Sequence, residues 1–300
     1  MKALRTPDTR FENLPDYDFE PHYVDVDDLR MHYVDTGPAN GPTNSPVILL
    51  LHGEPSWSYL YRHMIPPLQE AGFRVIAPDL IGFGKSDKPT MKSTYSYAGH
   101  VAWMKAFIEA LDLQDITLFC QDWGSLIGLR VAAENEQRFA RIVLGNGGMP
   151  TGDQEMPKVF KVWQKFARFS PWFPIGKIIQ KGTISNLSDA IVAAYDAPFP
   201  SAKYKAGARA FPQLVPTTAD DPASSANRAA WQVFKRWQKP FLTTFSNRDP
   251  ITRGGELAWQ ETVPGARGQD HVRILNGGHF LQEDKGPELA EVMIRFIAQS

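Results

Sequence analysis

The stretch Leu118-Phe119-Cys120-Gln121-Asp122-Trp123-Gly124-Ser125 decides the fold of this chain. Residues 115–120 are largely apolar and predict a buried strand, whereas residues 125–139 carry apolar side chains at helical spacing and predict a helix. Strand, sharp turn and helix in this order hold the central side chain exposed at the carboxyl end of a parallel strand. The central residue is Asp122, and a carboxylate there can attack saturated carbon without help from a base.

Asp122 also has a purely structural interpretation, because aspartate commonly caps the N-terminus of a helix. The neighbouring sequence favours chemistry instead. Residues 45–55 hold an apolar run that ends in His52-Gly53-Glu54-Pro55, which predicts a central strand and a loop beside the turn at Asp122. The backbone N–H groups of Glu54 and Trp123 would then form an oxyanion hole, with His52 fixing the loop by hydrogen bonding.

Two more polar residues follow predicted strands near the end of the chain. Residues 241–246 predict a strand that is followed by Asp249, and residues 272–275 predict a strand that is followed by His279. Nucleophile, acid and histidine therefore occur in the order Asp122, Asp249 and His279, each just past a strand. This is the order and placement of an α/β-hydrolase triad.

The chain resembles the haloalkane dehalogenases of the α/β-hydrolase superfamily over nearly its whole length. The resemblance rests on HYVDTG (residues 32–37), HGEPSWSYLYR (52–62), PDLIGFGKS (78–86), QDWGS (121–125) and GGHFLQED (277–284). It implies an α/β fold with a mostly parallel central sheet flanked by helices, and with an inserted helical cap. One departure is Cys120, which occupies a position where the elbow pattern usually has glycine.

The resemblance also implies a reaction in two halves. Asp122 displaces halide from a haloalkane to give an alkyl ester, and His279, oriented by Asp249, then activates water that hydrolyses this ester. The products are a primary alcohol, halide and a proton, and no cofactor is needed. Asn146 stands where another branch of the family carries the acid, but an amide cannot serve in that role.

In this family two side-chain N–H donors hold the released halide, and the resemblance assigns the first to the indole of Trp123. One branch takes the second from an asparagine in the loop where this chain has Glu54, and an ionised carboxylate cannot donate. The second donor is therefore expected in the cap. Trp163, on a helix predicted for residues 156–169, is favoured over Trp172 in a predicted turn, although Trp163 could also serve packing alone.

The segment between the strands near residues 141–144 and 241–246 is rich in proline, which predicts short helices and turns. We expect residues 1–148 and 227–300 to form one α/β domain, and residues 149–226 to form the helical cap. A small apolar substrate pocket is expected beneath this cap. Its expected lining residues, each also consistent with ordinary core packing, are Phe160, Phe166, Phe211, Pro212, Leu126, Val215 and Ile251.

Bulk properties exclude several other classes. The chain has 300 residues, a net charge of −1 and no basic run, so nucleic acid is not an expected partner. The seven histidines lack metal-ligand spacing, and the single Cys120 cannot form an internal disulfide. No signal segment or membrane-spanning run is visible, so we expect a cytoplasmic monomer with no membrane partner, acting on a small halogenated hydrocarbon with water and halide as the other ligands.

Three alternatives stay open at this point. An epoxide hydrolase shares the aspartate nucleophile and the His–acid pair, and Tyr195 and Tyr204 could protonate an epoxide, but Gln121 stands where those enzymes usually have histidine. A fluoroacetate-type dehalogenase would need an arginine where Trp123 stands. A non-catalytic binding protein of the same fold would not need all three triad positions filled.

Overall fold

A buried strand of five apolar residues, β4 (Val47–Leu51), lies at the centre of an eight-stranded sheet in the order β10-β9-β8-β7-β4-β5-β3-β2. The structure is a computed structural model that describes residues 2–37 and 45–300. Strands β5, β4, β7, β8, β9 and β10 run parallel, and β2 and β3 form an antiparallel edge. The other strands are β2 (Pro21–Val26), β3 (Leu29–Thr36), β5 (Arg74–Pro78), β7 (Ile116–Asp122), β8 (Phe139–Gly147), β9 (Phe241–Ser246) and β10 (Val272–Ile274).

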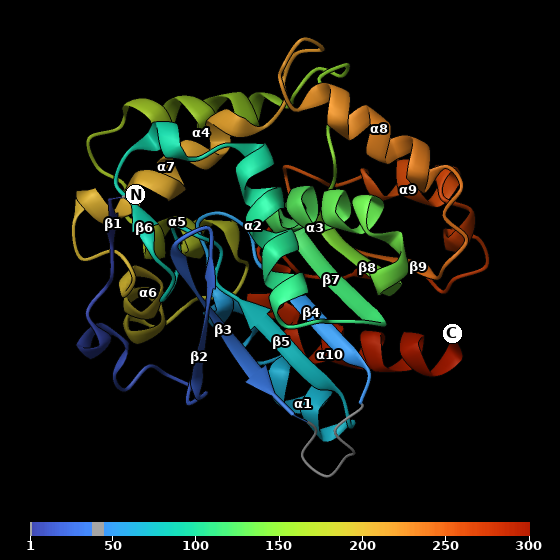
Figure 1. Cartoon of the computed structure of the whole chain (residues 1–300), viewed down its shortest axis with the longest axis horizontal. Helices are drawn as coiled ribbons and strands as arrows, with labels where there is room; N and C mark the ends of the chain where they lie inside the picture. Colours follow the sequence, from blue (N-terminus) through green and yellow to red (C-terminus); the bar gives the residue numbers. More distant parts are fainter. Residues whose placement is uncertain (1, 38–44) are drawn as a thin grey trace.

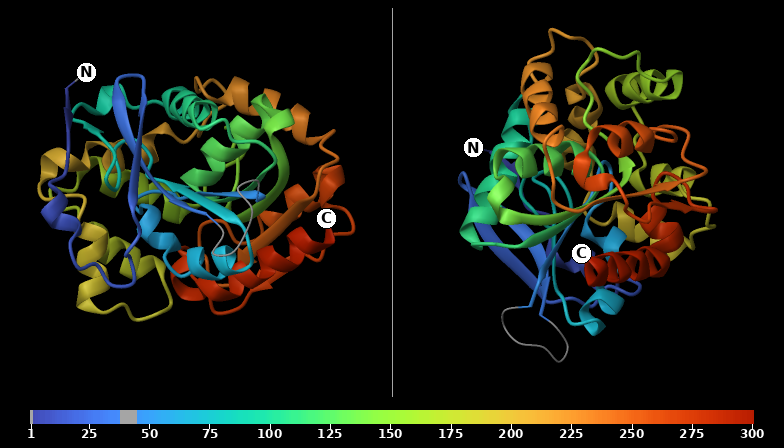
Figure 2. Two further views of the ribbon diagram at one scale, coloured as in Figure 1. Left: turned by 60° about the horizontal axis from the view of Figure 1, so that its bottom comes forward. Right: turned by 90° about the vertical axis from the view of Figure 1, so that its right-hand side faces the viewer.

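Helices cover both faces of this sheet (Figures 1 and 2). On one face lie α2 (Tyr97–Ala110) and α3 (Trp123–Glu134), and α8 (Ser224–Phe234) packs against α3. On the other face α1 (Ile65–Glu70) packs against α10 (Leu281–Gln299). Helix α9 (Glu256–Thr262) packs on β9 near the edge of the sheet. The expectation of a mostly parallel sheet between helices is confirmed.

Several short elements complete the chain. Strands β1 (Ala3–Leu4) and β6 (Lys88–Pro89) pair antiparallel apart from the main sheet. The 3-10 helices are η1 (Asp8–Phe11), η2 (Ser58–Tyr61), η3 (Lys92–Thr94), η4 (Glu136–Arg138), η5 (Ala202–Lys205) and η6 (Pro264–Ala266). No helix in the described ranges is both long and apolar enough to cross a membrane.

The segment between β8 and β9 forms a layer of short helices at the upper and left side of Figure 1. They are α4 (Lys158–Phe169), α5 (Ile175–Gly182), α6 (Asp189–Asp196) and α7 (Ala206–Leu214). We call residues 149–226 the cap segment. Its expected end at residue 226 falls inside the continuous helix α8, so a division of the chain at that point cuts through a helix that packs on α3.

The predicted elements around Asp122 differ from the observed ones mainly at their ends. Strand β7 continues to Asp122 itself, two residues beyond the predicted end, and α3 starts at Trp123 and ends at Glu134. Helix α3 stops there because Asn135 leaves helical geometry, with φ −137° and ψ 46°. Residues 136–139, predicted as helix, form η4 and the first residue of β8.

Close approach of backbones fixes the turn at Asp122. A Cβ atom at Gly124 would lie 2.0 Å from the carbonyl oxygen of Leu51 at the end of β4. A Cβ atom at Gly53 would lie 2.2 Å from Oδ1 of Asp122. Both positions therefore require glycine, because any larger residue would push the two loops apart.

We expect Gly124→Ala to lower the free energy of unfolding by about 1–3 kcal/mol or more, because the added methyl group overlaps backbone that cannot move aside. Urea unfolding measures this loss. Gly37→Ala is the matched control, since a Cβ atom at Gly37 meets nothing within 4 Å. Equal stability of the two variants would contradict the close packing of β4 against the start of α3.

Candidate active site

The backbone of Asp122 is held in a rare conformation, with φ 49° and ψ −127°. An L-residue adopts such a conformation only where its surroundings enforce it. Here the end of β7 turns directly into α3, so the side chain is presented between them and is 23% exposed. Its Oδ1 accepts a hydrogen bond of 2.7 Å from the backbone N–H of Glu54. The expected elbow is therefore present, and one carboxylate oxygen is already held by a backbone donor.

His279 lies between two carboxylates. Its Nε2 is 3.4 Å from Oδ2 of Asp122, and its Nδ1 is 3.1 Å from Oδ2 of Asp249. Asp249 follows β9 and is fully buried, where its Oδ1 accepts from the N–H of Ile251 at 2.9 Å. Its Oδ2 accepts from the N–H of Thr252 at 3.2 Å and also from the Thr252 hydroxyl. The three residues expected from their order in the chain thus lie in line.

The charges of these groups depend on one another. Burial alone would lower the pKa of His279, but the carboxylates of Asp249 and Asp122 raise it to about 10. Burial opposes ionisation of Asp249, yet His279 and the hydrogen bonds from Thr252 and Ile251 lower its pKa to about 2. The two neighbouring carboxylates therefore favour the protonated form of His279, and removing one of their charges would lower its pKa and make the ring available as a base.

Two amides that the sequence did not assign as functional hold the histidine in position. Gln121 donates from Nε2 to the carbonyl oxygen of His279 at 3.1 Å, and the same atom lies 3.3 Å from the Nε2 of His279. Asn146 donates from Nδ2 to the carbonyl oxygens of Gly278 and His279, at 2.8 and 3.0 Å. Its Oδ1 accepts from the N–H of Ser246 at 2.8 Å, so Asn146 ties the end of β9 to the histidine loop. The sequence signal that could have indicated this role is the place of Asn146 at the carboxyl end of a parallel strand, β8.

The loop after β4 is fixed by hydrogen bonds of His52, as expected. Its Nδ1 donates to the carbonyl oxygen of Gly53 at 2.9 Å, and its Nε2 accepts from the N–H of Leu80 at 3.0 Å. Full burial lowers the pKa of His52 and so keeps the ring neutral, as these two bonds require. This loop carries the Glu54 N–H that meets Asp122.

The side chain of Glu54 is buried beside Asp122, with 4% of the residue exposed. Burial and the neighbouring charge of Asp122 raise the pKa of Glu54 well above its usual value, while His279 and a hydrogen bond from the Trp163 indole partly offset this. Its Oε1 has no hydrogen-bond partner among the described residues. The sequence alone suggests an ionised Glu54 that cannot donate a hydrogen bond, whereas this environment favours the neutral acid.

A cavity of about 1300 Å³ lies above Asp122. Most residues expected at the pocket line it, together with Met149, Met156, Ile178, Trp231 and Trp259, which the sequence did not indicate. The expected residues in its wall are Glu54, Asp122, Trp123, Leu126, Phe160, Trp163, Phe166, Pro212, Val215, Ile251 and His279. Phe211 does not line the cavity. It is fully buried behind Trp123, with ring centroids 4.6 Å apart, because Pro212 takes the side of α7 that faces the cavity.

The two cap tryptophans lie differently in this cavity. Trp163, Phe166 and Phe173 form a cluster of three rings whose centroids are 5.6 to 5.7 Å apart, and the Trp163 indole reaches Glu54 beside the nucleophile. Trp172 is 66% exposed, so it lies where the cavity opens to solvent. Trp123 is 3% exposed and directly follows Asp122 in the chain. The indoles of Trp123 and Trp163 therefore both lie in the wall of the cavity that holds Asp122.

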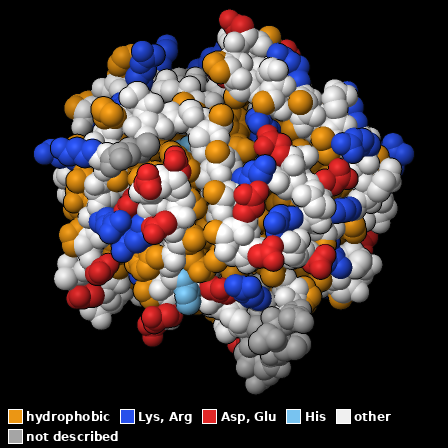
Figure 3. Space-filling model, viewed as in Figure 1, with side chains coloured by type: hydrophobic (Ala, Val, Ile, Leu, Met, Phe, Trp, Pro, Cys, Tyr) orange, Lys and Arg blue, Asp and Glu red, His pale blue; other side chains and the backbone are white. Residues whose placement is uncertain are grey.

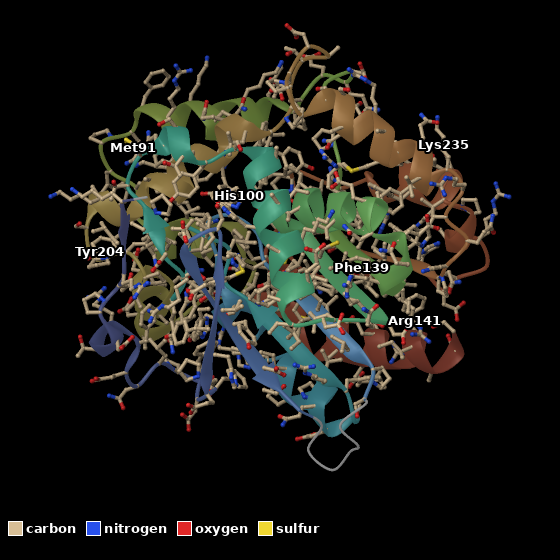
Figure 4. The ribbon with its side chains drawn as sticks, in the orientation of Figure 1. Met91, His100, Phe139, Arg141, Tyr204 and Lys235 are labelled. Atoms are coloured by element: carbon tan, nitrogen blue, oxygen red, sulfur yellow. The ribbon has the colours of Figure 1, made fainter. Side chains whose placement is uncertain are left out.

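Neither tyrosine of the epoxide hydrolase alternative is near the nucleophile. Tyr195 is fully buried and bonds to Glu283, which in turn accepts two hydrogen bonds of 2.7 and 2.6 Å from Arg62. Tyr204 lies at the left edge of the molecule in Figure 4, and no tyrosine of the described residues lines the cavity. The described part of the chain therefore places no tyrosine in the cavity wall to protonate an epoxide oxygen. The described residues also contain no cluster of three potential metal ligands.

Comparisons with known proteins identify the family of this chain. The family described as alpha/beta hydrolase fold matches residues 46–286. The haloalkane dehalogenase of Psychrobacter cryohalolentis is 56% identical over 302 residues, which cover 99% of this chain and 98% of that protein. The haloalkane dehalogenase of Mycobacterium marinum is also 56% identical, with 98% and 99% covered. The tetrameric structure of haloalkane dehalogenase DpaA from Paraglaciecola agarilytica matches with a TM-score of 0.90 and 36% identity, and 97% of each chain is covered.

The charge of His279 predicts how stability depends on pH. Because its pKa is higher in the folded protein than the unfolded value of about 6.5, the imidazolium stabilises the fold fully below pH 6.5, and this contribution is lost as pH rises toward 10. The difference in unfolding free energy between wild type and His279→Gln should therefore shrink by a few kcal/mol between pH 6.5 and 10, at ~1.4 kcal/mol per unit of pKa shift. Urea unfolding at several pH values measures it. His271→Gln is the control, since burial lowers the pKa of His271 and leaves it neutral throughout this range. A difference for His279→Gln that does not change with pH would contradict this charge state.

Proposed function

The chain belongs to the haloalkane dehalogenases, which are α/β-hydrolase-fold enzymes acting on carbon–halide bonds, and we propose that Asp122, His279 and Asp249 carry out this reaction through an alkyl ester on Asp122. One observation carries the proposal. Asp122 lies at the floor of an apolar cavity with Oδ1 held by the Glu54 N–H at 2.7 Å and Oδ2 3.4 Å from His279. This leaves Oδ2 to react with carbon.

In the first half of the reaction, Oδ2 of Asp122 forms a bond to the halogen-bearing carbon as the carbon–halogen bond breaks. The electron pair of that bond leaves with the halide. The halide is held by the indole N–H groups of Trp123 and Trp163, which line the cavity on the side of Asp122. Donors in a dry cavity stabilise the charge that develops on the halogen more than they stabilise the neutral substrate.

In the second half, water attacks the carboxyl carbon of the ester. Esterification removes the negative charge of Asp122, so the pKa of His279 falls and the ring can take a proton from water. Asp249 stabilises the imidazolium that results. The oxyanion forms on Oδ1 and is held by the N–H of Glu54 and by the N–H of Trp123, which as the first residue of α3 has no partner within the helix. The bond between the carboxyl carbon and Oδ2 then breaks, and the alcohol leaves with Oδ2 and the proton from His279. Oδ1 and the water oxygen form the new carboxylate, which releases one proton.

His279→Phe should release about one halide per enzyme and then stop, because alkylation needs no base whereas ester hydrolysis does. Mass spectrometry after exposure to 1,2-dibromoethane should show the alkyl adduct on the peptide that contains Asp122. His271 is half-buried and directly precedes β10, so the control variant His271→Phe should hydrolyse the substrate at the normal rate. An unmodified Asp122 in the His279 variant, with an active wild type, would contradict the two-step scheme.

Trp163→Phe keeps an aromatic ring but removes one halide donor. We expect it to lower the dehalogenation rate by at least about tenfold and to weaken bromide binding, measured as halide-dependent quenching of tryptophan fluorescence. Trp172→Phe is the matched control and should change neither quantity. The opposite pattern would assign halide binding to Trp172. If neither variant changes the rate or bromide binding, the mechanism contains no tryptophan donor from the cap.

Assembly and compartment stay predictions. We infer a monomer in the cytoplasm from the sequence, while the DpaA structure, at 36% identity, is described as tetrameric. Residues 149–226 are proposed to act as the cap over the cavity. The apolar wall of Phe160, Phe166, Leu126, Val215 and Ile251 suits an uncharged haloalkane.

A further inference from the structure

The cap segment contains a region of single-signed charge. Residues 156–188 hold six lysine and arginine residues and no aspartate or glutamate, although the whole chain carries −1. The six are Lys158, Lys161, Lys165, Arg168, Lys177 and Lys181, and all are exposed. Of these, Lys161 forms an ion pair with Glu155 at 2.7 Å, and the others form none among the described residues. These cations do not form a continuous basic run in the sequence, because they are spaced three to nine residues apart.

Exposed apolar side chains gather in the same region. Eight large apolar residues of the described chain are strongly exposed, and five of them lie between residues 159 and 184, so the exposure is concentrated there. The five are Val159, Val162, Phe169, Trp172 and Ile184, which are 41% to 71% exposed. Side chains of this kind surrounded by cations are typical of a surface that contacts something apolar and anionic.

Helix α4 brings both kinds of side chain to one face. Lys158, Lys161, Val162, Lys165 and Phe169 follow one another at helical spacing, and all five point to solvent. The opposite face of α4 is buried through Phe160 and Ala167. In Figure 3, blue and orange side chains lie together at the upper left, over α4 as placed in Figure 1.

This surface surrounds the mouth of the substrate cavity. Val159, Val162, Trp172 and Ile184 line the cavity while remaining exposed, so they form its rim. Lys177 and Lys181 of α5 lie on the same rim. A molecule bound to this surface would therefore cover the entrance through which substrate passes.

The charges select among possible occupants. A second copy of the chain meeting this surface through a two-fold axis would place like charges opposite each other, which is unfavourable. A double-stranded nucleic acid would satisfy the cations but would leave Val162, Phe169 and Trp172 unused. An anionic lipid bilayer satisfies both, because its head groups bind lysine and its acyl region accepts apolar side chains.

We propose that the exposed face of α4 and α5 docks on an anionic lipid bilayer and places the cavity mouth against it, so that apolar haloalkanes dissolved in the bilayer enter the enzyme from lipid. This replaces the expectation of no membrane partner. The contact is peripheral, since no described helix can cross a membrane. The proposal concerns the cap surface and does not depend on the roles given to Asp122, Trp123 or Trp163.

Sedimentation with vesicles tests the docking directly. Wild type should pellet with vesicles of phosphatidylglycerol mixed with phosphatidylcholine, should not pellet with phosphatidylcholine alone, and should be released at high salt. The double variant Lys161→Glu/Lys165→Glu should bind at least about tenfold more weakly. Phe169→Ser, which removes an apolar side chain without changing charge, should also weaken binding. Neither lysine nor Phe169 lines the catalytic cavity.

The control is Arg236→Glu/Arg267→Glu, which changes the net charge by the same amount. Both arginines are exposed and lie near the amino end of β9, where the N–H of Gly265 bonds to Trp237, at the opposite end of that strand from Asp249. This variant should bind vesicles like wild type. All variants should turn over 1-bromobutane in vesicle-free buffer at the wild-type rate, which shows that they are folded. If the lysine variant fails to fold, Phe169→Ser decides.

Several results would overturn the proposal. They are no binding of wild type to anionic vesicles, equal loss in the arginine control, or a dimer in solution that the cap variants dissociate. Tighter binding to single-stranded RNA than to vesicles, with the same lysines responsible, would assign the surface to nucleic acid instead. A second readout is turnover of a poorly soluble bromoalkane carried in vesicles, which should fall in the cap variants and not in the arginine control.

Discussion

The hydrogen bond from the Glu54 N–H to Asp122 joins the loops that follow β4 and β7, and the rest of the site depends on it. It can form because Gly124 lets the start of α3 approach the backbone of Leu51, and because Gly53 leaves room for the Asp122 side chain. The same approach holds Asp122 at positive φ, and so points its second oxygen toward His279. The apolar strands supply the rigid base for this geometry, since β4 and β7 are buried along almost their whole length.

The main features of this arrangement could be predicted because they are local. Each triad residue lies at or shortly after the carboxyl end of a parallel strand, so strand order alone brings Asp122, Asp249 and His279 to one edge of the sheet. Features that depend on how distant segments pack could not be predicted. Phe211 and Pro212 are neighbours in α7, yet only the position of that helix over Trp123 decides which of them reaches the cavity. The role of Asn146 depends in the same way on three loops that meet at its amide.

The charge of Asp122 changes during the proposed cycle, and this change alters the pKa of His279. While Asp122 is a free carboxylate, its charge favours the protonated form of His279. Once Asp122 is esterified, one of the two flanking charges is gone and the imidazole becomes available when water must be activated. Glu54 adds no second negative charge beside the departing halide, because burial and Asp122 favour its neutral form. The cavity therefore stays receptive to an anion.

The bond from Tyr195 to Glu283, with Arg62 behind it, connects α6 of the cap segment to the first turn of α10, four residues after His279. All three side chains are buried, so the connection is shielded from solvent and salt. A cap segment that lacks a hydroxyl at position 195 would leave the buried Glu283 carboxylate with Arg62 as its partner and without the hydrogen bond from the cap. If the cap segment is replaced, residues 62 and 283 should therefore be replaced with it, because they complete the hydrogen bonds of Tyr195.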